Sequence, residues 1–119
     1  MIWYGAKTMI GYKNMASINL KIARISKKIA KEYKPDKIIL FGSHAWGKPH
    51  KDSDADLFVV KDGDKPQIEM MRDVDRIISD RDMPVDILVY KPSQLEKRKK
   101  MGDPFILKII NSGKVLYEK

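Results

Sequence analysis

The sequence predicts an α/β domain of the α+β kind, in which helices flank a mixed β-sheet. Short apolar runs of strand length alternate with longer segments whose apolar residues recur at helical spacing. Glycine and proline separate these segments, as they do at the ends of helices and strands. The length of 119 residues fits one compact domain. Because strands and helices alternate along most of the chain, helices packed against a sheet are the expected architecture.

The first helix is expected at residues 17–34. Basic residues lie between its apolar ones, which is typical of an amphipathic helix, and Pro35 is expected to end it. The apolar positions are Ile18, Ile22, Ile25, Ile29 and Tyr33. Residues 1–14 are interpreted as an N-terminal extension, and the domain is expected at residues 15–119. An ordered extension, a flexible tail and an upstream start codon ahead of Met15 all stay open.

Strands are expected at several points. Residues 37–41 form a short apolar run that stops at a glycine, which predicts a buried strand ending in a turn. After the polar loop 42–53, residues 56–61 are expected to form a second strand. The continuous apolarity of residues 85–90 predicts a central strand covered on both faces. Residues 115–117 are expected to form a last edge strand.

A second helix is expected from about residue 67 to about Asp80. It follows a turn in which Asp64 is expected to act as the capping residue and Pro66 to open the helix. Helical spacing predicts that four apolar residues face inward. They are Ile68, Met71, Val74 and Ile78.

Two short helices are expected near the C-terminus. Ser93 and Glu96 match a capping box, which predicts a basic helix ending near Gly102. Residues 103–104, Asp-Pro, suit the start of another helix, and Gly113 is placed to end it. The apolar residues of this last helix are Phe105, Ile106, Ile109 and Ile110.

The composition is basic and free of cysteine. Twenty-four Lys and Arg residues against 16 Asp and Glu residues give a net charge of +8, which favours anionic partners such as nucleotides, nucleic acid or an acidic protein. Nucleic-acid binding stays undecided, because the lysines are spread along helix faces and are not interleaved with aromatic residues. The absence of cysteine excludes disulfides, thiolate metal sites and cysteine nucleophiles. A cytoplasmic location is expected, and no apolar run is long enough to cross a membrane.

Three carboxylates stand where strands should carry apolar side chains. Asp54 and Asp56 lie at the head of one strand, two residues apart, so their side chains share a face. Asp86 lies inside another strand, among apolar neighbours. Like charges this close repel each other unless a cation sits between them, and hard oxygen ligands select Mg²⁺ or Mn²⁺. If the two strands are adjacent, the three carboxylates form a two-metal site for phosphoryl transfer.

Gly42 and Ser43 directly follow the first strand. A glycine at this point lets the backbone approach a phosphate closely, and Ser43 can offer both its amide and its hydroxyl to phosphate oxygens. A simple tight turn is the competing interpretation when these two residues are taken alone.

These motifs resemble the DNA polymerase beta superfamily of nucleotidyltransferases, and in particular its minimal nucleotidyltransferase (MNT) type. The signature is a Gly-Ser turn, an Asp-x-Asp strand and a later third Asp, which arrive here in that order. The matching segments are residues 41–47, 53–57, 85–87 and the closing segment 104–117. The resemblance covers nearly all of the chain after the N-terminal extension, and it implies the nucleotidyltransferase fold.

The resemblance implies a role for each site residue. Gly42 and Ser43 would hold the nucleotide triphosphate. Asp54 and Asp56 would ligate two Mg²⁺ ions, with Mn²⁺ as the alternative metal, and Asp86 would complete the metal cluster and assist the attacking hydroxyl.

The segment between the turn and the carboxylates departs from the family at one position. Many members carry Arg where this chain has Trp46, so a phosphate contact or a brace of the loop is lost or comes from another group. Trp46 is expected to pack over the loop, with stacking on an adenine as a second role. His44 and His50 are interpreted as loop residues without a chemical role, because they fit no metal-binding spacing.

By this resemblance the protein is a metal-dependent nucleotidyltransferase that moves AMP from ATP to a hydroxyl acceptor. The acceptor would be a tyrosine of a helical HEPN-type toxin, so that the protein acts as the antitoxin. Two alternatives stay open: a weakly active or inactive nucleotide-binding module that neutralises its partner by contact, and a basic RNA-binding domain. The acceptor, the nucleotide and the oligomeric state, a homo-oligomer included, also stay open.

Overall fold

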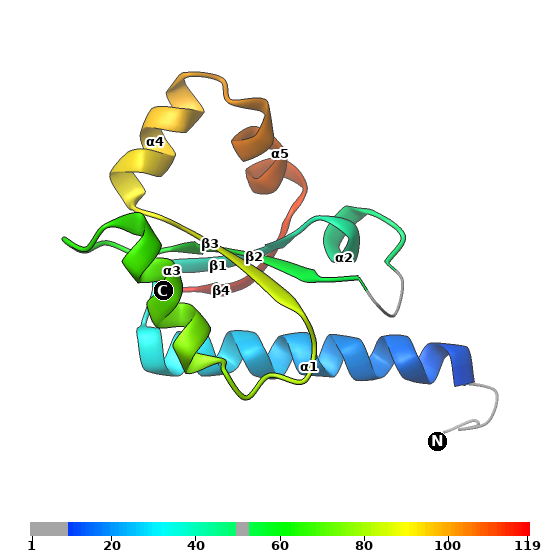
Figure 1. Cartoon of the computed structure of the whole chain (residues 1–119). Coiled ribbons are helices and arrows are strands. Elements are labelled where there is room, and N and C mark those ends of the chain that lie inside the picture. Colours follow the sequence, from blue (N-terminus) through cyan, green and yellow to red (C-terminus); the bar gives the residue numbers. More distant parts are fainter. Residues whose placement is uncertain (1–9, 50–52) are drawn as a thin grey trace.

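The computed structural model describes residues 10–49 and 53–119 (Figure 1). The helices are α1 (Ile10–Tyr33), α2 (Ser43–Trp46), α3 (Gln67–Ile77), α4 (Pro92–Lys100) and α5 (Pro104–Ser112). The strands are β1 (Lys37–Phe41), β2 (Ala55–Val60), β3 (Val85–Tyr90) and β4 (Lys114–Glu118). Residues 1–9 and His50 lie outside the described residues, so the interpretations that concern them stay predictions.

The strands form one mixed sheet, as predicted. Its order is β3-β2-β1-β4; β1 is antiparallel to both of its neighbours, and β2 is parallel to β3. The prediction that β3 is central was wrong, because β3 is an edge strand. Its sequence is apolar because helices cover both of its faces, with Val89 in one core and Leu88 against the other. Burial of the two faces of a strand does not indicate whether both of its edges are hydrogen-bonded to other strands.

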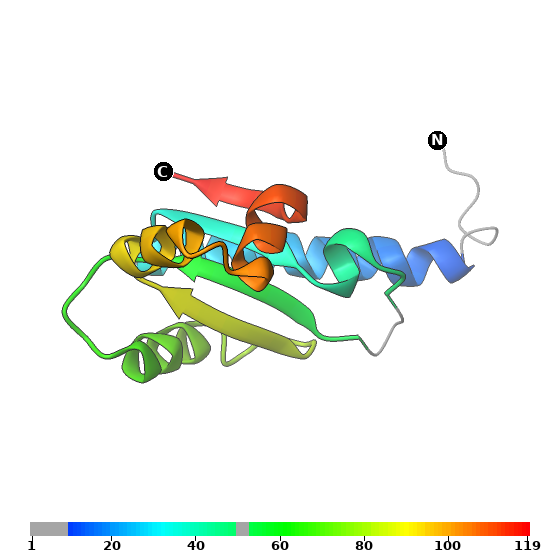
Figure 2. The same cartoon turned by 90° about the horizontal axis from the view of Figure 1, so that it is seen from above.

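Helices cover the two faces of the sheet with two separate cores. Figure 1 shows α1 on one side of the sheet and α4 and α5 on the other, the α4–α5 face. The buried side chains of α3 share a core with those of α1, so the opposite face is here called the α1–α3 face. Along β2, Leu57 and Val59 belong to the core on the α1–α3 face, and Phe58 and Val60 to the core on the α4–α5 face. Seen from above in Figure 2, α3 lies beside β3 at one edge of the sheet and β4 lies at the other.

The ends of the helices confirm some predictions and correct others. α1 ends at Tyr33 before Pro35, as predicted, but it begins at Ile10, upstream of the predicted start. α5 begins after Asp103, as predicted, and the Asp103 carboxylate accepts hydrogen bonds from two backbone amides. The short helix α2 lies inside the segment that was predicted to be a loop.

The predictions of two helix caps and of one inward-facing residue were wrong. The N-cap of α3 is Pro66 and that of α4 is Lys91, neither with a side-chain cap, so Asp64 caps nothing and Ser93 lies within α4. Neither proline nor lysine carries a short side-chain acceptor that could bond the amides of the first helical turn. In α3, Ile68 is 54% exposed, and Met70 is buried in its place beside the correctly predicted Val74.

Candidate active site

The pairing of β2 with β3 brings two of the predicted carboxylates together. Asp56 and Asp86 are register partners in the parallel ladder. Side chains alternate along a strand, and Phe58, two residues after Asp56, is buried on the α4–α5 face. Both carboxylates therefore point to the α4–α5 face, at the end of the sheet where β2 begins.

The carboxyl group of Asp56 is in an unfavourable environment for a negative charge. Partial burial raises the pKa of Asp56, and the charges of Asp86 and Asp54 and a hydrogen bond with Asp86 raise it further, while nearby His44 acts in the opposite direction. Burial and like charges both favour the protonated form. A cation placed between the two carboxyl groups would relieve the same repulsion.

Asp54 is held less closely than the other two acids. It is exposed and lies just before the first residue of β2, where no ladder fixes it. Within residues 10–49 and 53–119, no three acidic or histidine side chains are close enough to form a ready-made metal site. The structure thus joins Asp56 to Asp86 and leaves Asp54 as a neighbouring charge. The oxygen donors are of the type that Mg²⁺ and Mn²⁺ prefer, so the residues present fit such an ion.

Gly42 lies directly against Asp56. It follows Phe41, the register partner of Asp56 on the other side of β2. Its φ of +78° suits glycine, and a Cβ at this position would collide with the carboxylate of Asp56. The Gly42 carbonyl accepts hydrogen bonds from the amides of Ala45 and Trp46, at 2.9 and 3.0 Å, which starts α2. Glycine is therefore required both for the backbone angle and for the close approach.

Ser43 is the first residue of α2 and is partly buried. Its carbonyl accepts a hydrogen bond from the Gly47 amide at 3.1 Å, which closes the helical turn. The turn predicted from the sequence and the carboxylates predicted from the strands thus come together at one end of the sheet.

His44 lies in α2, so the prediction that it is a loop residue was wrong. It is 8% exposed, and its Nε2 lies 3.1 Å from the carbonyl oxygen of Ser53, immediately before Asp54. Its Nδ1 is buried and has no hydrogen-bond partner among the described residues. His44 therefore links α2 to the segment that leads into the carboxylates. Its place directly after the Gly-Ser turn was the signal that could have found it.

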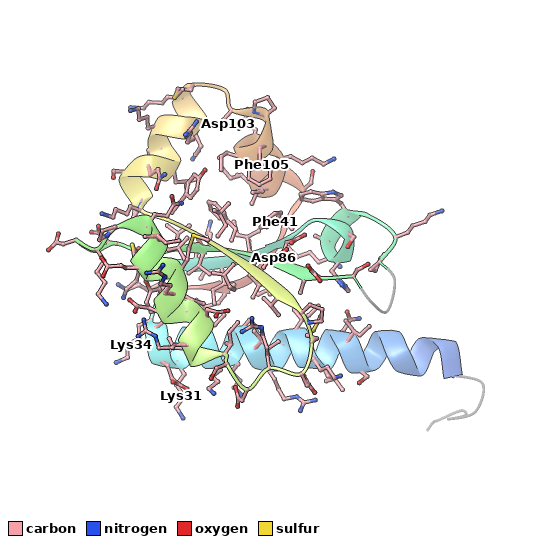
Figure 3. The ribbon with its side chains drawn as sticks, in the orientation of Figure 1. Lys31, Lys34, Phe41, Asp86, Asp103 and Phe105 are labelled. Atoms are coloured by element: carbon pink, nitrogen blue, oxygen red, sulfur yellow. The ribbon has the colours of Figure 1, made fainter. Side chains whose placement is uncertain are left out.

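A small aromatic cluster borders the turn on the α4–α5 face. The rings of Phe41 and Phe105 meet edge to face with centroids 5.7 Å apart, and Figure 3 shows them pointing toward each other between β1 and α5. The ring centroids of Trp46 and Phe41 are 6.4 Å apart. The Lys108 ammonium lies 4.9 Å from the centre of the Trp46 ring. Trp46 therefore packs beside Phe41 and Lys108. Sequence reasoning missed Lys108, because nothing local connects α5 to α2.

A mixed sheet with an acidic pair at the head of two adjacent strands, facing a Gly-Ser turn, defines a class of phosphoryl-transfer folds. The family comparison agrees. The profile of the family described as polymerase beta, nucleotidyltransferase matches residues 23–119, and the chain belongs to this family.

Solved structures share the fold at low sequence identity. A proposed nucleotidyltransferase from Sulfolobus solfataricus is 18% identical with a TM-score of 0.65, covering 91% of this chain and 86% of that one. A toxin-antitoxin structure with AMP-PNP is 22% identical with a TM-score of 0.56, covering 82% of this chain and 73% of that one. The toxin-antitoxin MntA-HepT is 20% identical with a TM-score of 0.52, covering 85% and 73%.

Two further searches, one for related curated proteins and one for membrane-spanning helices in the described part of the chain, found nothing. A search of curated proteins finds no match. Among the described residues, no helix combines the length and the apolar character needed to span a membrane.

Proposed function

We propose that the protein is a metal-dependent nucleotidyltransferase that moves AMP from ATP to a tyrosine of a helical, HEPN-type toxin and so acts as its antitoxin. The close approach of Gly42 to Asp56, the register partner of Asp86, carries this proposal. Two carboxyl groups whose negative charges oppose each other, and which a bound cation would stabilise, thus lie at a turn where a phosphate can approach the backbone. Membership of the nucleotidyltransferase family supports the reaction class.

In this proposal each residue has a defined task. Asp56 and Asp86, with Asp54 beside them, hold Mg²⁺ or Mn²⁺ ions, which when bound neutralise the phosphate charge and lower the pKa of the acceptor hydroxyl. Gly42 and Ser43 bind the phosphates that leave. The acceptor oxygen forms a bond to the α-phosphorus, the bond to the β-phosphate oxygen breaks, and pyrophosphate departs. Asp86, exposed at the edge of the sheet, takes the proton from the acceptor and passes it to solvent.

Lys108 is proposed to supply the cation that many relatives carry as Arg at the position of Trp46. The indole of Trp46 holds the Lys108 ammonium 4.9 Å from its centre, beside the helix that Ser43 begins. The cation–π contact restricts a long side chain that is otherwise exposed. Lys108 has no ion-pair partner in the described part of the chain. Its charge is therefore free to bind the β- and γ-phosphates.

Separate observations support ATP as the nucleotide and a toxin as the partner protein. The fold is shared with toxin-antitoxin structures, and one of these holds AMP-PNP. The net charge of +8 suits an anionic nucleotide and an acidic partner protein.

The test is transfer of label from ATP carrying ³²P at the α-phosphate to the protein encoded beside this one in its genome. We expect Asp56→Asn and Asp86→Asn to lower the transfer by about 100-fold or more. Asp62→Asn, which removes an exposed acid after β2, is the matched control and should retain full activity. Labelling that persists in Asp56→Asn would overturn the mechanism.

The second candidate is an antitoxin that acts by contact with its nucleotide site idle. The loosely held Asp54 and the replacement of Arg by Trp46 favour it. A variant with Asp54, Asp56 and Asp86 all changed to Asn would then still protect cells from the toxin. Under the first proposal the same variant loses protection.

A further inference from the structure

We propose that a groove between α1 and β4 docks an acidic amphipathic helix of a partner protein. The groove has a volume of about 620 Å³ and lies on the α1–α3 face, opposite to the carboxylates. Its lining is mostly apolar and contains no acidic residue. The lining residues are Ala23, Ser26, Lys27, Ala30, Lys31, Leu116 and Tyr117.

Small side chains form the floor of the groove. Ala23, Ser26 and Ala30 follow one another on one side of α1, at separations of three and four residues. The Ser26 hydroxyl donates to the Ala23 carbonyl at 2.9 Å, so it presents no unsatisfied polar group to an apolar neighbour. Small residues in a row let a second helix approach closely, because no large side chain separates the two backbones.

A β-bulge in β4 forms the wall. Ile38 pairs with Tyr117 and Ile39 with Val115, so Leu116 is an extra residue in β4. Without the bulge, Leu116 and Tyr117 would point to opposite faces. With it, both pack against the core on the α1–α3 face and line the groove. The bulge therefore adds a second apolar side chain to this surface.

Two lysines at the rim give the groove its charge preference. On another side of α1, Lys21 and Lys28 pair with Asp82 and Asp80, at 3.5 and 3.1 Å. Lys27 and Lys31 are exposed, as Figure 3 illustrates for Lys31, and neither has an ion pair within the described residues. They lie four residues apart, which places both charges along one edge of the groove.

These features favour one occupant over the others. A second copy of this chain carries a charge of +8 and would be repelled by the lysine rim. RNA would find a single aromatic ring, Tyr117, and an apolar floor, where single-strand binding needs several stacking platforms. A helix with one apolar face and acidic residues beside it matches both the floor and the rim. Docking there leaves the carboxylate site on the opposite face open.

The test is site-specific photocrosslinking of the full chain in cells of its source organism. Benzoylphenylalanine replaces Ala23 in the groove or, as the control, Val115, which is 53% exposed on β4 but outside the groove lining. We expect an adduct from position 23 alone, whose crosslinked peptide, sequenced by mass spectrometry, lies in an acidic amphipathic helix. Adducts only with RNA or with a second copy, or none specific to position 23, would overturn the proposal.

Charge reversal provides the second arm. Lys27→Glu together with Lys31→Glu should lower the yield of this adduct by about tenfold. Lys97→Glu with Lys100→Glu, on exposed positions of α4, makes the same change in net charge and should leave the yield unchanged. Equal loss in both pairs would show that net charge alone attracts the partner and would overturn the docking site. ATP binding, measured in parallel, keeps the outcome separate from that of the proposed function.

Discussion

The two edges of the sheet differ in how their charges are arranged. Near the β3 edge, the charges of Asp56 and Asp86 lie side by side and oppose each other, and Gly42 packs against Asp56. In the groove between α1 and β4, Lys27 and Lys31 are exposed to solvent beside an apolar floor, so water screens their repulsion. One edge is strained in a way that a cation would relieve. At the groove the two lysines have no ion pair within the described residues, which leaves them able to pair with acidic groups of a docked partner.

The largest expected effect comes from filling the space beside the acids. Gly42→Ala should cost about 1–3 kcal/mol of stability and abolish ATP binding, because the new Cβ collides with Asp56 at a positive φ. Gly102→Ala is the matched control: its φ is +72°, but a Cβ there meets nothing within 4 Å. Thermal unfolding and calorimetric titration with ATP measure the two effects. Equal behaviour of the two variants would mean that the backbone angle alone matters.

The next effect concerns the cation at the edge of the site. Lys108→Met should weaken ATP binding by about tenfold and leave AMP binding unchanged, because AMP lacks the phosphates that this lysine is proposed to contact. Lys114→Met removes an exposed charge on β4 and serves as the control. Titrations with both nucleotides in Mg²⁺ would decide. A parallel loss of ATP and AMP affinity would contradict the assignment.

A smaller effect follows from the raised pKa of Asp56. The unfolded chain loses the Asp56 proton at lower pH than the folded chain does. Folding stability therefore falls as the pH rises from the pKa of Asp56 in the unfolded chain to its raised pKa in the folded chain. Asn carries no such proton, so Asp56→Asn should raise the unfolding temperature at pH 7 by a few degrees in the absence of divalent metal. The gain should shrink below the usual carboxyl range. A variant less stable than the wild type at pH 7 would contradict the account of repulsion.

The smallest effect is expected in the groove. Lys27→Ala should change the free energy of unfolding by less than about 0.5 kcal/mol, because the lysine is exposed and has no ion pair among the described residues. Denaturant unfolding measures this directly. A larger loss would mean that Lys27 supports this chain itself and does not serve a partner.

The sequence predicted the parts of the site that depend on local periodicity. The head of a strand drew attention to Asp56, and Asp86 stood out against its apolar neighbours, whereas Asp54 lies just before β2 and outside its ladder. The alternation of strands with helices along the chain also predicted the mixed sheet. Apolarity could not reveal that β3 is an edge strand, because both faces of an edge can be covered.

Contacts between distant segments could not be predicted in the same way. The link from His44 to Ser53 and the position of Lys108 over Trp46 depend on how α2 and α5 pack against the sheet. Neither pair has a sequence spacing that is typical of a motif. The bulge at Leu116 is likewise set by pairing with β1, so the groove was invisible in the sequence.

The central claim is that Asp56 and Asp86 act together to hold a cation beside the phosphate-binding turn. Calorimetric titration of Mn²⁺ into the protein, with and without AMP-PNP, tests it most directly. We predict that Mn²⁺ binds the wild type more tightly with the nucleotide present and that either Asp56→Asn or Asp86→Asn abolishes this binding. Mn²⁺ binding of equal strength in the wild type and both variants would contradict the claim.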